Sequence, residues 1–263
     1  CSAWVCGDSD RRSSHRFGPE YGHARSSGLR CFLCPDLYLH QAVDENHVNS
    51  VATTSPRLEL GASDEWFNYN DYLDFDNSND YLDADDTDFQ LTTGADPYTV
   101  YTVFANRDAD SSEDAVYGWG AETTANVEAT AFFNGASELL HIDNASTSTA
   151  TTHAATPEPV LLRHTYDGAT EEMLINGTSV GSNAKVNAIN DSRLVIGSDS
   201  SGNGPTTSYF DGGIAETVQY AATQSAGDID LIESYLSMKY GINRPQLDST
   251  PGTDFVASDG QAV

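Results

Sequence analysis

The densest set of residues able to bind a metal ion lies between positions 80 and 88. Five aspartates fall within this short stretch: Asp80, Asp83, Asp85, Asp86 and Asp88. Carboxylate oxygens are the ligands that Ca²⁺ prefers, so the spacing predicts a calcium site. The order is not that of an EF-hand loop, because the sixth-position glycine and the closing glutamate are absent. A solvated acidic surface is the alternative interpretation of the same residues.

The second candidate site is the segment SDSSGNGPTTS at residues 198–208, which is longer than a tight turn and typical of a binding loop. Its Asp199 and Asn203, with backbone carbonyls, could hold a cation or a sugar hydroxyl, and Tyr209 follows directly. Tyr117 and Trp119 have aromatic faces of the kind that stack on a pyranose ring. Packing in the core is the alternative role for Trp119.

These residues need strands to position them, and the sequence predicts an antiparallel β-structure. Short segments rich in β-branched and aromatic residues recur with turn residues between them. The segments are 98–105, 115–120, 127–133, 138–142, 160–166, 171–176, 193–197 and 214–220. The first is aromatic and β-branched throughout, which predicts burial on both faces. Asn176-Gly177 is typical of a hairpin turn, and the Ser/Thr/Ala run at 146–156 predicts a flexible connection or a weak edge strand.

Residues 71–76 and 80–85 form a direct repeat, DYLDFD and DYLDAD. Alternation in the first copy places Leu73 and Phe75 on one face and the tyrosine and aspartates on the other, as in a half-buried strand. The intervening Asn-Ser-Asn has the composition of a turn. We therefore expect the second copy to return as a neighbouring strand.

After position 222 the apolar residues recur at intervals of three and four, which predicts a helix with one buried face. They are Ile229, Ile232, Leu236 and Tyr240, widened by Leu231, Tyr235 and Met238. Ser225 can cap the start of the helix with Asp228 as its partner, and Gly241 can end it.

Two stretches together resemble the laminin-G-like, concanavalin A-like jelly-roll family. FDGGIAETVQY followed by IESYLSMKYGI resembles its closing strand and terminal helix, and FDNSNDYLDAD resembles its opening segment. The hairpin TYDG…MLINGTSVG and the strand RLVIG resemble its central strands. The resemblance covers roughly residues 64–244. It implies an all-β fold, an antiparallel β-sandwich of the concanavalin A-like jelly-roll type with one C-terminal helix.

This fold hosts glycoside hydrolases and polysaccharide lyases, so catalysis must be argued from a site. The family's hydrolases carry Glu-x-Asp-x-x-Glu, and no such string occurs here. The nearest, between Asp83 and Asp88, contains only aspartates, whose shorter side chains reach a sugar poorly. A lyase needs a His or Tyr base near a cation, and the Arg163 next to His164 falls on the opposite face of its strand. We therefore favour a protein without catalysis.

The most unusual feature of the composition is its net charge of −28. Only Lys185 and Lys239 are lysines, and aspartate outnumbers glutamate. Such a field repels nucleic acid and anionic membranes. It is typical of a protein adapted to concentrated salt, with an ordinary acidic exported protein as the alternative. Because the sequence lacks an apolar stretch of about 18 residues, we expect no membrane insertion.

The four cysteines are confined to the N-terminal region: Cys1, Cys6, Cys31 and Cys34. They could form disulfides, bind zinc or belong to a processed lipoprotein start, and a poorly ordered leader is the interpretation we favour. The composition turns acidic after a Thr/Ser/Pro linker. We therefore expect an N-terminal extension at 1–55, a jelly-roll domain at 56–245 and a tail at 246–263.

These features favour a non-catalytic module that binds a glycan or another surface. We expect it to be extracellular, on a cell surface or on a virion, and to come from a salt-adapted source. We expect Ca²⁺ to be the ion that it binds, and the chain could form an oligomer. A structural component of a virion or cell surface, acting only in protein–protein assembly, is the second hypothesis. A hydrolase or lyase of the same fold is the third.

Overall fold

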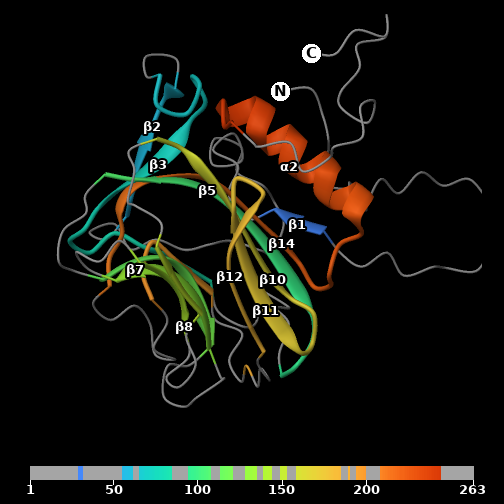
Figure 1. The fold of residues 1–263 in the computed structure, drawn as a ribbon. Coiled ribbons are helices and arrows are strands. Elements are labelled where there is room, and N and C mark those ends of the chain that lie inside the picture. Colours follow the sequence, from blue (N-terminus) through green and yellow to red (C-terminus); the bar gives the residue numbers. More distant parts are fainter. Residues whose placement is uncertain are drawn as a thin grey trace, which may run out of the picture.

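The protein is a β-sandwich of two antiparallel sheets with one helix against its outer face (Figure 1). The computed structural model describes residues 29–31, 55–61, 65–84, 94–107, 113–120, 128–134, 139–143, 149–152, 158–184, 189, 194–199 and 208–243. The predicted all-β sandwich with a C-terminal helix is confirmed. Within these ranges no helix is both long and apolar enough to cross a bilayer.

The larger sheet has eight strands in the order β12-β11-β10-β5-β14-β3-β2, with β1 paired to the far end of β14. Its strands are β1 (Leu29–Cys31), β2 (Arg57–Glu59), β3 (Tyr72–Asp76), β5 (Tyr98–Asn106), β10 (Val160–Tyr166), β11 (Thr170–Ile175), β12 (Thr178–Ala184) and β14 (Asp211–Tyr220). The predicted hairpins are confirmed. Asn176 and Gly177 both have positive φ in the turn between β11 and β12, as the twist of a tight hairpin requires.

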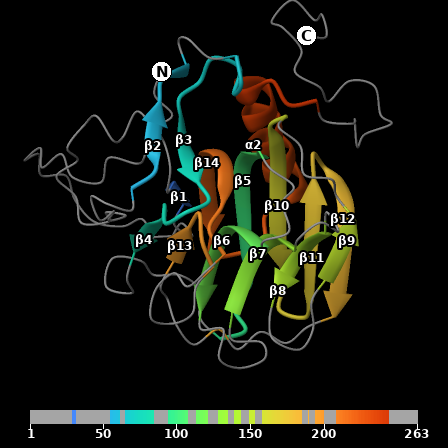
Figure 2. The ribbon, with the colours of Figure 1, turned by 90° about the vertical axis from the view of Figure 1, so that its left-hand side faces the viewer.

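The smaller sheet has six strands in the order β4-β13-β6-β7-β8-β9 (Figure 2). They are β4 (Leu82–Ala84), β6 (Glu113–Gly120), β7 (Glu128–Asn134), β8 (Leu139–Asp143), β9 (Thr149–Thr152) and β13 (Leu194–Ile196). The Ser/Thr/Ala run supplies β9, which pairs only with β8 at the end of the described sheet. Of the two alternatives for that run, the structure therefore has the edge strand.

The middle of the larger sheet is buried on both faces, as the sequence of β5 predicts. Tyr98 and Phe104 point into the core between the sheets. Tyr101, Val103 and Ala105 alternate with them and pack in a second core on the outer face, beneath the helix. Successive side chains of a strand point to opposite faces, so a single apolar strand supplies both cores.

The helix α2 (Ala226–Tyr240) covers the outer face of the larger sheet, opposite the smaller sheet (Figure 1). The Ser225 side chain accepts a hydrogen bond from the backbone of Asp228, and Gly241 adopts the left-handed conformation at the other end. Both predicted caps are confirmed. The helix therefore begins and ends where its sequence directs.

The predicted width of the buried helix face is wrong. Leu231, Tyr235 and Met238 are at least half exposed, whereas Glu233 and Ser237 are buried. Arg163 projects from the outer face of β10, and its Nε lies 3.2 Å from Glu233 Oε1. A buried charge of this kind needs a partner, so the helix turns its glutamate, rather than the wider apolar stripe, toward the sheet.

The repeat at 71–85 also departs from expectation. Its first copy is β3, whose Leu73 and Phe75 face the main core as predicted. Its second copy is β4, which pairs with β13 in the other sheet rather than with β3. The intervening turn, with Asn77 at φ 56°, crosses from one sheet to the other. Turn composition predicted the reversal, but not the partner of the returning strand.

Part of the N-terminal extension belongs to the sandwich. Leu29–Cys31 forms β1 and pairs antiparallel with Val218–Tyr220 of β14. The rest of the predicted extension up to residue 54 and the predicted tail at 246–263 lie outside the described residues, as do Cys1, Cys6 and Cys34. Residues 29–31 of the predicted extension are therefore a strand of the larger sheet.

Removal of residues 1–54 should leave a folded sandwich with a loosened sheet edge. Among the described residues both cores are built from Leu58 onward, so unfolding should stay cooperative and the near-UV circular dichroism unchanged. The loss of β1 should speed amide exchange at 218–220, where it pairs, and leave exchange in β10 unaltered. Non-cooperative unfolding of the shortened chain would show that the N-terminal region is part of the core.

Candidate functional site

The aromatic residues predicted to stack on a sugar lie in the interior. Tyr117 and Trp119 are fully buried on β6, and their rings stack on one another with centroids 5.7 Å apart. Neither ring has an exposed face in this structure. Core packing, the alternative stated for Trp119, is therefore the arrangement observed for both residues.

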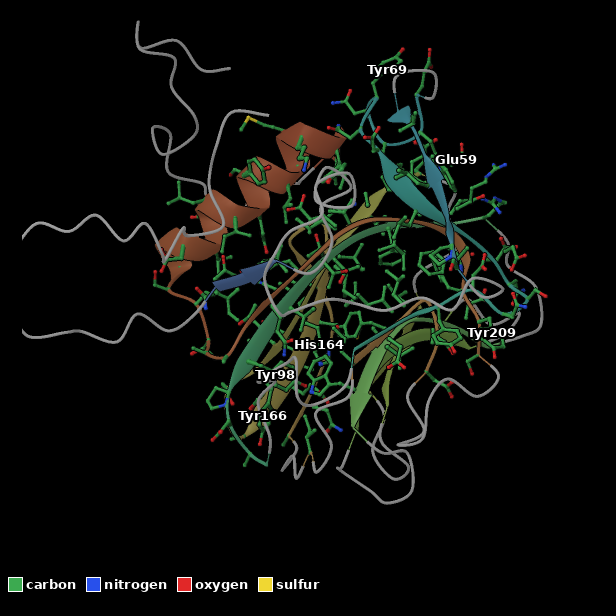
Figure 3. The ribbon with its side chains drawn as sticks, turned by 180° about the vertical axis from the view of Figure 1, so that it is seen from behind. Glu59, Tyr69, Tyr98, His164, Tyr166 and Tyr209 are labelled. Carbon is green, nitrogen blue, oxygen red and sulfur yellow. The ribbon has the colours of Figure 1, made fainter. Side chains whose placement is uncertain are left out.

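Tyr117 belongs to a buried polar network with Tyr98, His164 and Glu171. Figure 3 shows Tyr98 and His164 side by side within the sandwich. Tyr117 Oη lies 2.7 Å from His164 Nδ1, and His164 Nε2 lies 2.8 Å from Glu171 Oε1. The Tyr98 hydroxyl donates to the same carboxylate oxygen at 2.8 Å. Burial, and then the charge of Glu171, raise the pKa of Tyr117, so this phenol stays a hydrogen-bond donor.

One proton arrangement satisfies these contacts. In it Tyr117 donates to His164 Nδ1, and Nε2–H of the histidine donates to Glu171. The four side chains come from β5, β6, β10 and β11, so the network ties the two sheets together. Every member of the network is fully buried. We therefore assign the network a structural role, as a set of buried polar groups that satisfy one another's hydrogen bonds. The position of His164 in this network, with Arg163 on the other face of β10, gives it a structural role in the core.

Backbone hydrogen bonds connect the described parts of the two predicted polar sites. The backbone N–H of Asn77, in the turn before Asp80, donates to the carbonyl of Phe210, and the Phe210 N–H donates to Gly197. These bonds place Asn77 next to the segment that begins at Tyr209 and connect that segment to Gly197, two residues before Asp199. Asp199 is buried, with Ser198 Oγ 3.4 Å from its carboxylate, and Tyr209 is half-buried. Asn203 lies outside the described residues.

The predicted calcium ligands are only partly described. Asp80 is buried and Asp83 is half-buried on β4, while Asp85, Asp86 and Asp88 lie outside the described residues. In the described part of the chain no three metal-binding side chains gather closely enough to hold an ion. Burial, and then the charges of Asp76 and Asp74, raise the pKa of Asp80 to about 6. Calcium binding stays a prediction.

A feature that the sequence analysis did not identify is the turn at residues 65–70, between β2 and β3. Asn68 and Tyr69 have φ values of 52° and 60°, and the Tyr69 side chain is exposed, with 58% of its surface accessible. The left-handed conformation costs a non-glycine residue roughly 1–2 kcal/mol. Figure 3 shows Tyr69 at the outer end of the molecule, far from the buried network.

The turn is held rigidly on both sides of Tyr69. Phe67 inserts into the core beneath α2, with its ring 4.8 Å from that of Tyr72. The side-chain amides of Asn68 and Asn70 both donate to the carbonyl of Lys239, at 3.0 and 2.6 Å. These bonds satisfy a carbonyl in the last turn of α2, which has no partner within the helix. The turn and the helix end therefore support each other.

The Tyr69 hydroxyl donates to Glu65 Oε1 at 3.0 Å, which fixes the direction of the ring. This hydrogen bond and the glutamate charge raise the pKa of Tyr69. Nearby, the Arg107 guanidinium lies 5.5 Å from the centre of the half-buried Trp66 ring and pairs with Asp74 and Asp211. The turn thus combines an exposed aromatic ring, a carboxylate and a firm support.

The local sequence WFNYN carries the one signal that could have identified this turn. Asparagine adopts the left-handed conformation more readily than most residues, and here it alternates with aromatic residues. The pattern does not show which aromatic ring is buried, because Trp66, Phe67 and Tyr69 are equivalent in composition. Only the structure distinguishes the inserted Phe67 from the exposed Tyr69.

Comparison with known proteins gives distant likenesses. No protein-family model matches the chain, and no curated protein matches it. NanB sialidase from Streptococcus pneumoniae is 15% identical, with a TM-score of 0.48 over 60% of this chain and 26% of the sialidase. A botulinum neurotoxin type C structure, concerned with two ganglioside molecules, is 8% identical, with a TM-score of 0.48 over 69% of this chain and 45% of the toxin chain.

A botulinum neurotoxin DC binding domain in complex with rat synaptotagmin II is 9% identical, with a TM-score of 0.49 over 69% of this chain and 46% of the domain. The chain therefore spans from about a quarter to less than half of these proteins. Likeness at this level says nothing about what this chain binds. The narrower laminin-G-like or concanavalin A-like assignment stays a prediction.

Replacement of Glu171 by leucine should destabilise the sandwich by about 2–4 kcal/mol, because it leaves Tyr98 and His164 buried without their shared acceptor. Urea unfolding followed by circular dichroism measures the change. Glu172→Leu, on the same strand but pointing outward and half-buried, should change the free energy of unfolding far less. Equal effects of the two substitutions would contradict the structural role of the network.

Asp80→Asn should raise the melting temperature at pH 7 in calcium-free buffer. The folded-state pKa of Asp80, about 6, exceeds the usual 3.8, so the folded protein binds this proton more tightly than the unfolded one. Ionised Asp80 therefore opposes folding above pH 6, and stability from this group returns as the pH falls from about 6 to 4. Asp80→Asn should remove the dependence of the melting temperature on pH between about 4 and 6 that this group causes. Asp83→Asn serves as the control.

The same variant tests the calcium prediction. If Ca²⁺ binds Asp80 in the folded state, millimolar calcium should raise the melting temperature of the wild type and not of Asp80→Asn. A response of both proteins to NaCl, with no response of the wild type to calcium, would leave these aspartates as solvated surface.

Proposed function

We propose that this chain is a non-catalytic binding module that holds a neutral glycan against Tyr69. The observation that carries the proposal is the conformation of this residue. Tyr69 combines a left-handed backbone with a mostly exposed ring, so packing offsets little of its backbone cost. Strained residues held by a firm surrounding structure concentrate at functional sites.

The chemistry of the turn suits a pyranose ring. The apolar face of a sugar packs on an aromatic ring, while its hydroxyls need hydrogen-bond partners around the edge. Glu65 lies beside the Tyr69 hydroxyl and can accept from a sugar hydroxyl. Since Asn68, Asn70 and Phe67 fix the turn before any ligand arrives, little conformational entropy is lost on binding.

Charge selects the class of glycan. The chain carries a net charge of −28, and Glu65 lies directly at the proposed site. Sulfated, uronic or sialylated sugars would meet a repulsive field that weakens only as salt screens it. A neutral glycan meets no such barrier. We therefore propose neutral glycans over anionic ones.

The wider setting of the module is part of the same proposal. The excess of acidic residues supports a salt-adapted source and export to the cell surface, the medium or a virion. Calcium at Asp80 is proposed as a structural ion that would neutralise this buried carboxylate and its neighbour Asp76.

Substitution of Tyr69 should separate binding from stability. Tyr69→Gly should abolish glycan binding and raise the free energy of unfolding by up to roughly 1 kcal/mol, since glycine relieves the left-handed strain. Tyr69→Phe should retain binding, because the ring face remains. Titration of neutral cello-, xylo- and manno-oligosaccharides, followed by NMR shifts at residues 65–70, measures the affinity.

Tyr235→Ala is the matched control, because it removes a tyrosine of similar exposure from α2. It should leave the affinity for the glycan unchanged, and no oligosaccharide should yield new reducing ends. Tighter binding of alginate than of every neutral glycan, or turnover of any of them, would refute the proposal.

A further inference from the structure

The outward face of α2 is an apolar stripe that the described sandwich does not cover. Leu231, Tyr235 and Met238 are 62%, 50% and 51% exposed. Their spacing of four and three residues places them along one side of the helix. The opposite side, with Leu236 and Tyr240, is buried on the sheet. A helix of a monomeric protein presents polar residues on its solvent face, so this stripe needs an explanation.

Charges of opposite sign border the two ends of the stripe. Asp228 and Asp230 are exposed near the start of the helix, and Lys239 stands near its end. Lys239 Nζ lies 2.9 Å from Glu216 Oε2 and 5.8 Å from the centre of the Tyr235 ring. It is therefore held beside the stripe rather than extended into solvent. Along the helix the order is acid, three apolar residues, base.

A second α2 helix that runs in the opposite direction presents a complementary order of charges and apolar residues. If two α2 helices pack antiparallel about a two-fold axis between Ser234 and Tyr235, Leu231 of one copy meets Met238 of the other. Asp230 then meets Lys239, and each Tyr235 lies over the small Ser234 of the other copy. The antiparallel arrangement also opposes the two helix dipoles favourably. A parallel pair would instead place like charges together.

We propose that a second copy of this chain covers the α2 stripe and forms a two-fold dimer through these residues. The proposal is independent of the glycan site, since Tyr69 lies outside the stripe. Because each copy carries a net charge of −28, long-range repulsion opposes association in dilute buffer. Salt screens that repulsion over distances beyond about 3 Å at 1 M, while the apolar contact persists. Dimerisation should therefore strengthen with salt.

Sedimentation equilibrium of the full chain tests the proposal at protein concentrations from about 10 µM to 1 mM, because association follows mass action. The monomer mass is 28.3 kDa. We expect reversible dimers whose Kd falls at least tenfold between about 0.1 M and 2 M NaCl. Tyr235→Asp should weaken the dimer at least tenfold at high salt, whereas Tyr69→Asp, an identical change at another exposed tyrosine, should not.

A pair of charge reversals tests the antiparallel register. Asp230→Lys and Asp96→Lys make the same change in net charge, and both sites are exposed. Lower repulsion should strengthen the dimer of Asp96→Lys. Asp230→Lys should weaken it at about 0.5 M NaCl, because the new lysine would face Lys239 of the partner.

A monomer at every concentration and salt, or equal effects of the two tyrosine substitutions, would overturn the proposal. So would a dimer that Asp230→Lys strengthens as much as Asp96→Lys does. Circular dichroism checks that each variant is folded. If Tyr235→Asp does not fold, Leu231→Ser takes its place as the stripe variant.

Discussion

The structure depends on the need to cover both faces of one sheet. β5 and β14 lie in the middle of the larger sheet, and every residue between the two ends of β14 and all of β5 are buried. The smaller sheet covers one face, and α2 must cover the other. Polar contacts fix where the helix lies: Arg163 meets Glu233, and Glu216 accepts from both Lys239 and Tyr240. Buried charges tolerate few arrangements, so these contacts set the rotation of α2 about its axis. Burial of apolar side chains supplies most of the free energy that holds α2 on the sheet.

Most strands and both ends of the helix could be predicted from the sequence, because period, turn residues and caps are local signals. The face of α2 could not be predicted. Its apolar residues occupy more than half of the helix circumference, and the choice between Glu233 and Leu231 as the buried residue depends on Arg163, a residue 70 positions before Glu233. The partner of β4 was missed for a similar reason, since a turn sequence does not specify which sheet the chain enters next.

The candidate site was harder still. Aromatic residues of strands such as Tyr117 and Trp119 have the right chemistry for a sugar but fill the core. Tyr69 was not distinguishable by composition, because its exposure comes from its neighbours. Phe67 takes the buried position, and two asparagines tie the turn to a carbonyl of α2 far along the chain. The same helix end thus contacts the sheet through Glu216 and carries the carbonyl that holds the turn.

The position of β14 in the chain has a consequence for how the protein reaches its folded state. β14 joins β3 to β5, and these two strands are not bonded to each other. Asp211 pairs with Asp76, a contact between residues 135 positions apart. Until residue 220 has been synthesised, the larger sheet exists only as two unjoined halves with exposed edges. Contacts so distant in sequence form slowly, so the nascent chain carries open strand edges until β14 has been made, and its dense negative charge keeps such chains apart.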